Sequence, residues 1–206
     1  MNAPASTAPA GGDAQEWQSA LLRLLDDPYV FAAAGARRHP DWAADVLAVL
    51  RRENADPREW AGLDWDRDGE ERAAAGPSFP FRAGLTPDGL RAALHPLEHA
   101  AAVDLLASLT QEWTFEPAPL YGRAPAEREA VREDARTLLR RFGPGGAASY
   151  WTTSRLARTT TAPDFLRARL EGGGTPLTDY AEEVGLIVTA PPETGEVGVF
   201  WSFNAT

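Results

Sequence analysis

The C-terminal stretch constrains the fold of this chain more than any other. Residues 184–190 and 196–203 are two apolar runs separated by a Pro/Gly-rich loop at residues 191–195. Apolar residues recur at every second position in both runs, and a period of two is typical of β-strands. We therefore predict an antiparallel β-hairpin with one apolar face that upstream helices must cover. That face would comprise Val184, Leu186, Val188 and Ala190 with Val197, Val199, Trp201 and Phe203.

The opposite face of this hairpin is also unusually apolar. Ile187 lies on one strand and Phe200 on the other, among glycine, serine and threonine. An exposed strand face is normally polar, so either another element covers these two side chains or a ligand or partner binds them.

The chain before the hairpin has mainly helical patterns. Trp17, Leu21, Leu24 and Leu25 form one apolar stripe at helical spacing, and Trp42, Val46, Val49 and Leu50 form another. Residues 29–38, which are rich in alanine, are predicted as a short helix between them. Proline is favoured at the first position of a helix, so further helix starts are predicted at several prolines. These are Pro28, Pro40, Pro57, Pro87, Pro96, Pro125 and Pro163.

The order of these elements predicts an α+β fold, in which an N-terminal helical part packs on a small, mainly antiparallel C-terminal sheet. Residues 1–12 are small, uncharged and punctuated by proline, so they are predicted as a disordered tail. Residues 13–206 are predicted as a single domain, with a helical part at 13–142 and a sheet part at 147–206. Residues 148–153 are predicted as a further strand.

Composition excludes several classes of function. The chain has no cysteine, which excludes disulfides and thiolate chemistry, and we predict a cytoplasmic location. The chain has no lysine, and all 20 residues counted as Lys or Arg are arginine, which is typical of a GC-rich genome. The net charge of −10 argues against binding nucleic acid or an anionic membrane surface. An acidic protein is suited to a basic protein partner. No cofactor is predicted.

An acidic loop is the first candidate site. Residues 64–69 read D-W-D-R-D-G, which matches the start of a calcium-binding loop, but residue 75 is alanine where an EF-hand has a bidentate glutamate. We therefore interpret the loop as a solvated surface that contacts a partner, and we predict no metal site. The predicted partner-binding residues are Asp64, Trp65, Asp66, Asp68, Glu70 and Glu71.

A second pattern lies at residues 95–99, which read H-P-L-E-H. This segment resembles the H-x-x-E-H pattern of inverted zincins, in which two histidines bind zinc and the glutamate is a general base. The favoured interpretation is a helix start, with Pro96 at the first helical position, His95 outside the helix and Glu98 in its first turn.

A third candidate is the hydroxyl-rich segment at residues 152–161, whose two arginines could hold a phosphate or carboxylate. It has no Gly-rich phosphate-binding loop beside it, so an exposed strand and loop is the favoured interpretation. If a small-molecule pocket lies between the helices and the sheet, its predicted lining residues are Tyr150, Trp151, Arg155 and Arg158.

Two functions stay open from the sequence. The favoured one is a non-catalytic protein that binds or neutralises a basic protein through its acidic surface, in the manner of an immunity protein or antitoxin. The alternative is a small-molecule-binding protein or an enzyme of secondary metabolism, with a pocket between helices and sheet. The lack of a recognisable catalytic constellation favours the first, and no sequence motif decides between them.

Overall fold

The computed structural model describes residues 11–64, 73–109, 119–144, 146–167, 176–180, 182–192 and 195–204. Residues 1–10 of the predicted tail lie outside these ranges, whereas Gly11 and Gly12 already belong to the first helix. Among the described residues, no helix is long and apolar enough to cross a bilayer.

A six-stranded sheet forms the centre of the molecule, and every adjacent pair of strands is antiparallel. The strands follow the spatial order β2-β1-β6-β5-β4-β3. Their bounds are Val30–Ala36 (β1), Leu63–Asp64 (β2), His95–Leu97 (β3), Ser149–Thr152 (β4), Glu182–Thr189 (β5) and Glu196–Asn204 (β6). The predicted α+β class is confirmed, with the C-terminal hairpin at the middle of the sheet.

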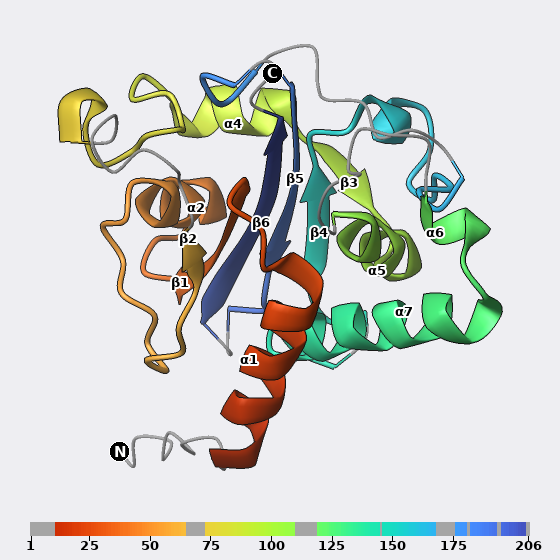
Figure 1. Cartoon of the computed structure of the whole chain (residues 1–206). Coiled ribbons are helices and arrows are strands. Elements are labelled where there is room, and N and C mark those ends of the chain that lie inside the picture. Colours follow the sequence, from red (N-terminus) through yellow and green to blue (C-terminus); the bar gives the residue numbers. More distant parts are fainter. Residues whose placement is uncertain are drawn as a thin grey trace.

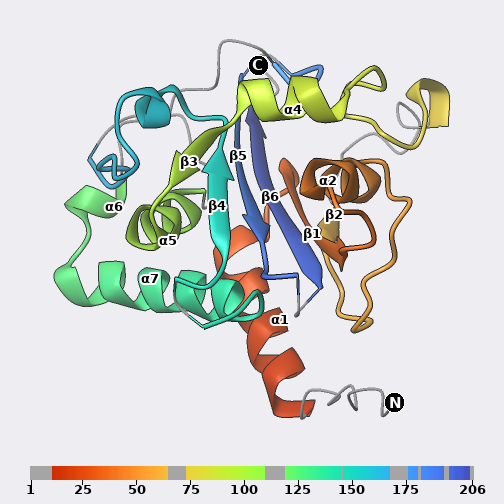
Figure 2. The same cartoon turned by 180° about the vertical axis from the view of Figure 1, so that it is seen from behind.

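Helices cover both faces of this sheet, as the two opposite views show (Figures 1 and 2). One face packs against α1 (Gly11–Leu25), α5 (His99–Ser108) and α7 (Pro125–Arg140), and the other against α2 (Trp42–Leu50) and α4 (Pro87–Ala93). The short helix α6 (Pro119–Gly122) precedes α7, and a 3-10 turn, η2 (Arg155–Arg158), follows β4. The sheet is therefore the middle layer of three.

The hairpin forms as predicted, but its two apolar stripes lie on opposite faces. Leu186 pairs with Phe200, and Ile187 pairs with Val199. Val184, Leu186 and Val188 therefore share the α1/α5/α7 face with Phe200, whereas Val197, Val199, Trp201 and Phe203 share the α2/α4 face with Ile187. A change of one residue in register exchanges the faces of a strand, and the 190–195 connection sets that register. Both faces are buried, which answers the question that Ile187 and Phe200 raised.

The segment Tyr29–Arg38 was expected to be helical, and that prediction is wrong, because Val30–Ala36 is strand β1. It pairs along its whole length with β6, so pairing within the sheet overrides the helical propensity of alanine. Its small side chains allow close packing: a Cβ on Gly35 would lie 2.5 Å from Val49 of α2. Together with β2 and β3, β1 shows that residues 13–142 supply three of the six strands.

The predicted helix starts have mixed outcomes. Those at Pro87 and Pro125 are confirmed, and the hydroxyl of Thr86 caps α4 by accepting from the Gly89 amide at 3.1 Å. The start at Pro28 is wrong because β1 follows it, and the start at Pro96 is wrong because Pro96 lies in β3. Pro40 precedes α2 by two positions, with Asp41 as the N-cap. At Pro57 and Pro163 the described residues form turns.

Candidate functional site

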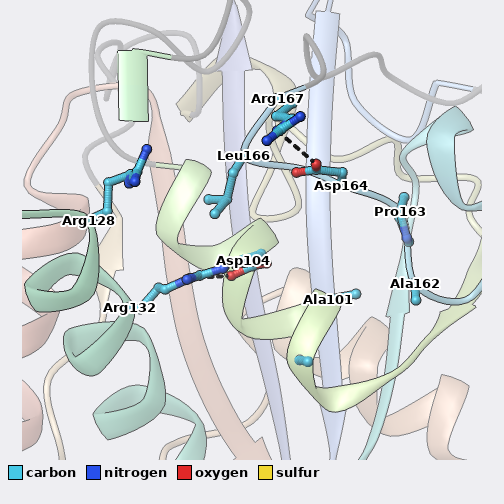
Figure 3. Close-up of a pocket in the computed structure, with 10 residues that line it drawn as sticks. Ala101, Asp104, Arg128, Arg132, Ala162, Pro163, Asp164, Leu166 and Arg167 are labelled. Atoms are coloured by element: carbon cyan, nitrogen blue, oxygen red, sulfur yellow. Dashed lines mark hydrogen bonds and ion pairs between the residues drawn. The ribbon is translucent and has the colours of Figure 1, made fainter. Parts of the chain in front are cut away.

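A pocket of about 420 Å³ lies between α5, the first half of α7 and the segment 162–167 (Figure 3). Its polar side chains are three arginines and two aspartates, and its apolar wall is alanine, proline and leucine. We name it the arginine pocket. Its lining residues are Ala100, Ala101, Asp104, Arg128, Arg132, Ala162, Pro163, Asp164, Leu166 and Arg167.

The pattern of α5 places Asp104 toward this pocket. Its apolar positions, Ala101, Ala102, Leu105 and Leu106 among them, are buried against the sheet and α7. Asp104, one turn after Ala101, is only partly buried and accepts two hydrogen bonds from Arg132 of α7, at 2.7 Å from Nε and 3.0 Å from Nη2. These bonds raise the pKa of Arg132. The pair fixes the guanidinium plane at the pocket wall and ties α5 to α7.

The third wall is attached to α5 by backbone and side-chain contacts. The Ser108 hydroxyl lies 2.7 Å from the Asp104 carbonyl of its own helix and 3.2 Å from the Phe165 carbonyl, and the Phe165 side chain is fully buried. Next to this anchor, Leu166 points into the pocket and Arg167 lies 3.4 Å from Asp164 (Figure 3). The buried phenylalanine thus holds an otherwise irregular segment at a fixed place above α5.

The electrostatics of the arginine pocket differ from those of the whole chain. Its lining carries three guanidinium groups and two carboxylates, so it is positive by one charge in a chain of net charge −10. Arg167 is largely exposed, whereas Arg128 and Arg132 are both half-buried. Guanidinium groups bind carboxylate and phosphate oxygens in pairs of parallel hydrogen bonds. The arrangement is therefore suited to holding a small anion against an apolar wall.

The four residues predicted to line a small-molecule pocket do not line this one. Tyr150 is buried on the α5 side, where its hydroxyl lies 2.9 Å from Nδ1 of His99. Trp151 faces the α2 side and stacks on Trp42, with ring centroids 4.3 Å apart. Arg155 and Arg158 lie exposed on η2. The structure therefore separates the two aromatic residues onto opposite faces of the sheet.

The predicted partner-binding residues Trp65, Asp66, Asp68, Glu70 and Glu71 lie outside the described ranges. Asp64 is the last residue of β2 and receives two hydrogen bonds from Arg52, at 2.5 Å from Nε and 2.8 Å from Nη2. Arg52 also donates to the Pro77 carbonyl at 2.6 Å, so this ion pair joins three segments of the chain. Recognition of a basic partner through this loop stays a prediction.

The H-x-x-E-H segment is divided between a strand and a helix. His95 lies in β3, Glu98 is the N-cap position of α5, and His99 is its first residue. Glu98 accepts from the Thr161 hydroxyl at 2.9 Å, whereas His99 is paired with Tyr150. Burial lowers the pKa of both histidines, which favours their neutral forms. Within the described parts of the chain, no group of three or more His, Asp or Glu residues could hold a metal ion.

Sequence reasoning did not find the arginine pocket, although one signal was present. Arginine occupies every fourth position along α7, at residues 128, 132, 136 and 140, which places the four on one side of the helix. The contribution of segment 162–167 depends on long-range contacts, and no local pattern reports them.

The comparisons with known proteins add no family to this picture. No family model matches the chain, and neither the curated proteins nor the solved structures contain a match.

Proposed function

We propose that this protein binds a small anionic molecule in the arginine pocket. The ligand would carry a carboxylate or phosphate group and a compact apolar part. The observation that carries the proposal is the convergence of Arg128, Arg132 and Arg167 from two separate segments on one cavity with an apolar wall. Small-molecule binding is the alternative function that the sequence left open. The proposed site lies at a different place in the fold from the residues predicted for it.

The dimensions of the pocket support a metabolite-sized ligand. A cavity of about 420 Å³ falls within the range of small-molecule sites, which is about 300 to 1,000 Å³. Ala100, Ala101 and Leu166 provide the surface for an apolar part, and the guanidinium groups orient the anionic end. The Asp104–Arg132 pair fixes the Arg132 guanidinium at the wall of the pocket, while the Asp104 carboxylate opposes an incoming anion.

The anion could bind through Arg128 and Arg167, with Arg132 supporting the wall between them. Electrostatic attraction at exposed guanidinium groups weakens as salt rises. We therefore expect affinity to decrease with ionic strength and to depend on Arg128 and Arg167 together. A cytoplasmic location, which we also propose from the absence of cysteine, would expose the pocket to phosphorylated and carboxylated metabolites.

The test is isothermal titration calorimetry with inorganic phosphate, succinate and glycerol 3-phosphate, at low and high sodium chloride. We expect saturable binding of at least one probe, weakened by salt. The double variant Arg128→Gln/Arg167→Gln should weaken that binding about tenfold or more, because each tenfold step corresponds to only about 1.4 kcal/mol.

The matched control is Arg155→Gln, which removes an exposed guanidinium that does not line the pocket. This single substitution removes one positive charge, whereas the double variant of the pocket removes two. Arg155→Gln/Arg158→Gln therefore serves as a second control that removes the same charge as the pocket variant. Both controls should retain the affinity of the unmodified protein. Equal weakening by the control pair and the pocket pair, or no binding of any probe, would refute the proposal.

A further inference from the structure

We propose a second ligand site, in the cavity between α1, the C-terminal end of α7 and the loop 51–62, and we infer that it takes a neutral, planar heteroaromatic amide. The cavity measures about 460 Å³ and is separate from the arginine pocket. This inference rests on different residues from the proposed function and does not depend on it. The lining residues are Asp13, Glu16, Trp17, Arg58, Trp60, Thr137, Arg140, Arg141, Gly143 and Pro144.

The wall of this cavity contains a buried guanidinium packed against a pair of indole rings, whose centroids lie 5.4 Å apart. The Arg141 side chain is fully buried, and its Cζ lies 5.0 Å from the ring centroid of Trp17 and 4.5 Å from that of Trp60. Both distances are within the range of cation–π contacts. Arg141 directly follows α7, so it connects that helix to α1 and to the loop that carries Trp60.

Two carboxylates hold Arg141 but leave one of its nitrogens without an acceptor. Nε and Nη2 donate to Glu196 at 3.1 and 3.3 Å, and Nη2 also donates to Asp56 at 2.6 Å. Nη1 is buried, and no acceptor for it exists among the described residues. A buried donor without an acceptor is rare in proteins and costs stability, so a ligand atom that accepts from Nη1 would gain that interaction.

The charges around Arg141 select a neutral acceptor over an anionic one. Arg58 lies 3.3 Å from Glu196, so two arginines already face the two carboxylates Asp56 and Glu196. A ligand carboxylate would add an uncompensated negative charge to this buried and balanced cluster, which is unfavourable. A carbonyl oxygen or ring nitrogen would satisfy Nη1 without that cost.

The two indole rings differ in how firmly they are held. The Trp17 Nε1 group donates to the Leu138 carbonyl at 3.2 Å, and the ring is buried. Trp60 is only half-buried and belongs to a loop without regular secondary structure. Its ring centroid lies 5.4 Å from the guanidinium carbon of Arg58 and 4.5 Å from that of Arg141. Trp60 is therefore the more accessible side of the cage, and we infer that a flat ring stacks on its indole with an acceptor atom directed at Nη1.

The rim of the cavity carries carboxylates that could accept hydrogen bonds from the NH₂ group of an amide. Asp13 and Glu16 project from the first turns of α1, and both are exposed. Glu16 also accepts from Arg140 at 3.2 Å. A primary amide offers a carbonyl oxygen to Arg141 and an NH₂ group to these carboxylates, and an attached aromatic ring offers a flat face to Trp60.

The test is a titration of the protein with nicotinamide. Binding is followed through the indole N–H signals of Trp17 and Trp60 in two-dimensional NMR. Nicotinic acid and cyclohexanecarboxamide are the matched controls, since the first is charged and the second is not planar. We expect nicotinamide to bind with millimolar affinity and to shift both indole signals. Nicotinic acid and cyclohexanecarboxamide should bind about tenfold more weakly or not at all.

Variants then separate this site from the arginine pocket. Trp60→Leu should abolish the nicotinamide response, whereas Trp42→Leu, at a half-buried tryptophan elsewhere, should preserve it. Arg128→Gln/Arg167→Gln should leave it unchanged. Absence of any shift at Trp17 and Trp60, or equal affinity for nicotinamide and nicotinic acid, would overturn the inference whatever the arginine pocket binds.

Discussion

Gly185→Ala is the substitution that tests the central packing of the fold most sharply. Gly185 lies opposite Trp201 in the β5–β6 hairpin, and a Cβ there would lie 2.2 to 2.4 Å from three atoms of the indole ring. The ring has no room to retreat, because Trp201 is fully buried and contacts Phe81 edge to face at 5.4 Å. Overpacking a core by one methyl group typically costs about 1 to 3 kcal/mol, and this rigid contact belongs at the upper end.

The measurement is urea or thermal unfolding of the two proteins followed by circular dichroism. A loss of about 3 kcal/mol corresponds to a fall in melting temperature of about 6 to 12 °C for a chain of this size. Gly84→Ala is the matched control, since a Cβ at Gly84 would meet no atom within 4 Å, and it should change stability by less than about 0.5 kcal/mol. If Gly185→Ala is as stable as the unmodified protein, the register that places Trp201 over Gly185 is wrong.

Two further predictions concern a buried carboxyl group and a helix cap. Glu183 is 3% exposed, burial raises its pKa, and Oε2 has no partner within the described residues. Its native state therefore binds a proton more tightly than the unfolded state, so stability should fall as pH rises from about 4.5 through the raised value. Glu183→Gln should remove that decrease in pH-dependent denaturation, and an unchanged pH slope would contradict the assignment. Thr86→Ala should cost about 1 kcal/mol through loss of the α4 cap, whereas the exposed Thr159→Ala should be neutral in the same unfolding assay.

The parts of the fold that follow from local patterns could be predicted from the sequence. The stripe from Trp17 to Leu25 indicates α1, and the period of two indicates β5 and β6. Tyr29–Arg38 fails as a prediction for a physical reason, because alanine favours helix locally while pairing with β6 and packing under α2 decide the outcome. The prediction that both apolar stripes of the hairpin share one face is also wrong. The pairing register of the two strands decides which helices each stripe faces, and the apolar period does not report that register.

The two pockets were beyond sequence reasoning because each joins segments far apart in the chain. Asp104 and Arg132 face one another only because α5 and α7 pack side by side, and segment 162–167 reaches them through one buried phenylalanine. Arg141 acquires its cage from α1 and from a loop more than eighty residues earlier. Charge and apolar periodicity describe single elements, so neither reports where two elements meet.

The anion affinity of Asp104→Asn tests the proposed function most directly. This substitution removes one of the two carboxylates that line the arginine pocket and releases Arg132 from its bidentate partner. An anion in the pocket should then bind more tightly, by about threefold to tenfold at low salt, because an opposing charge has been removed. The measurement is calorimetric titration, into the two proteins, of the phosphate, succinate or glycerol 3-phosphate probe that binds the unmodified protein. Unchanged or weaker binding of that probe by a folded Asp104→Asn variant would contradict an anion site between α5, α7 and residues 162–167.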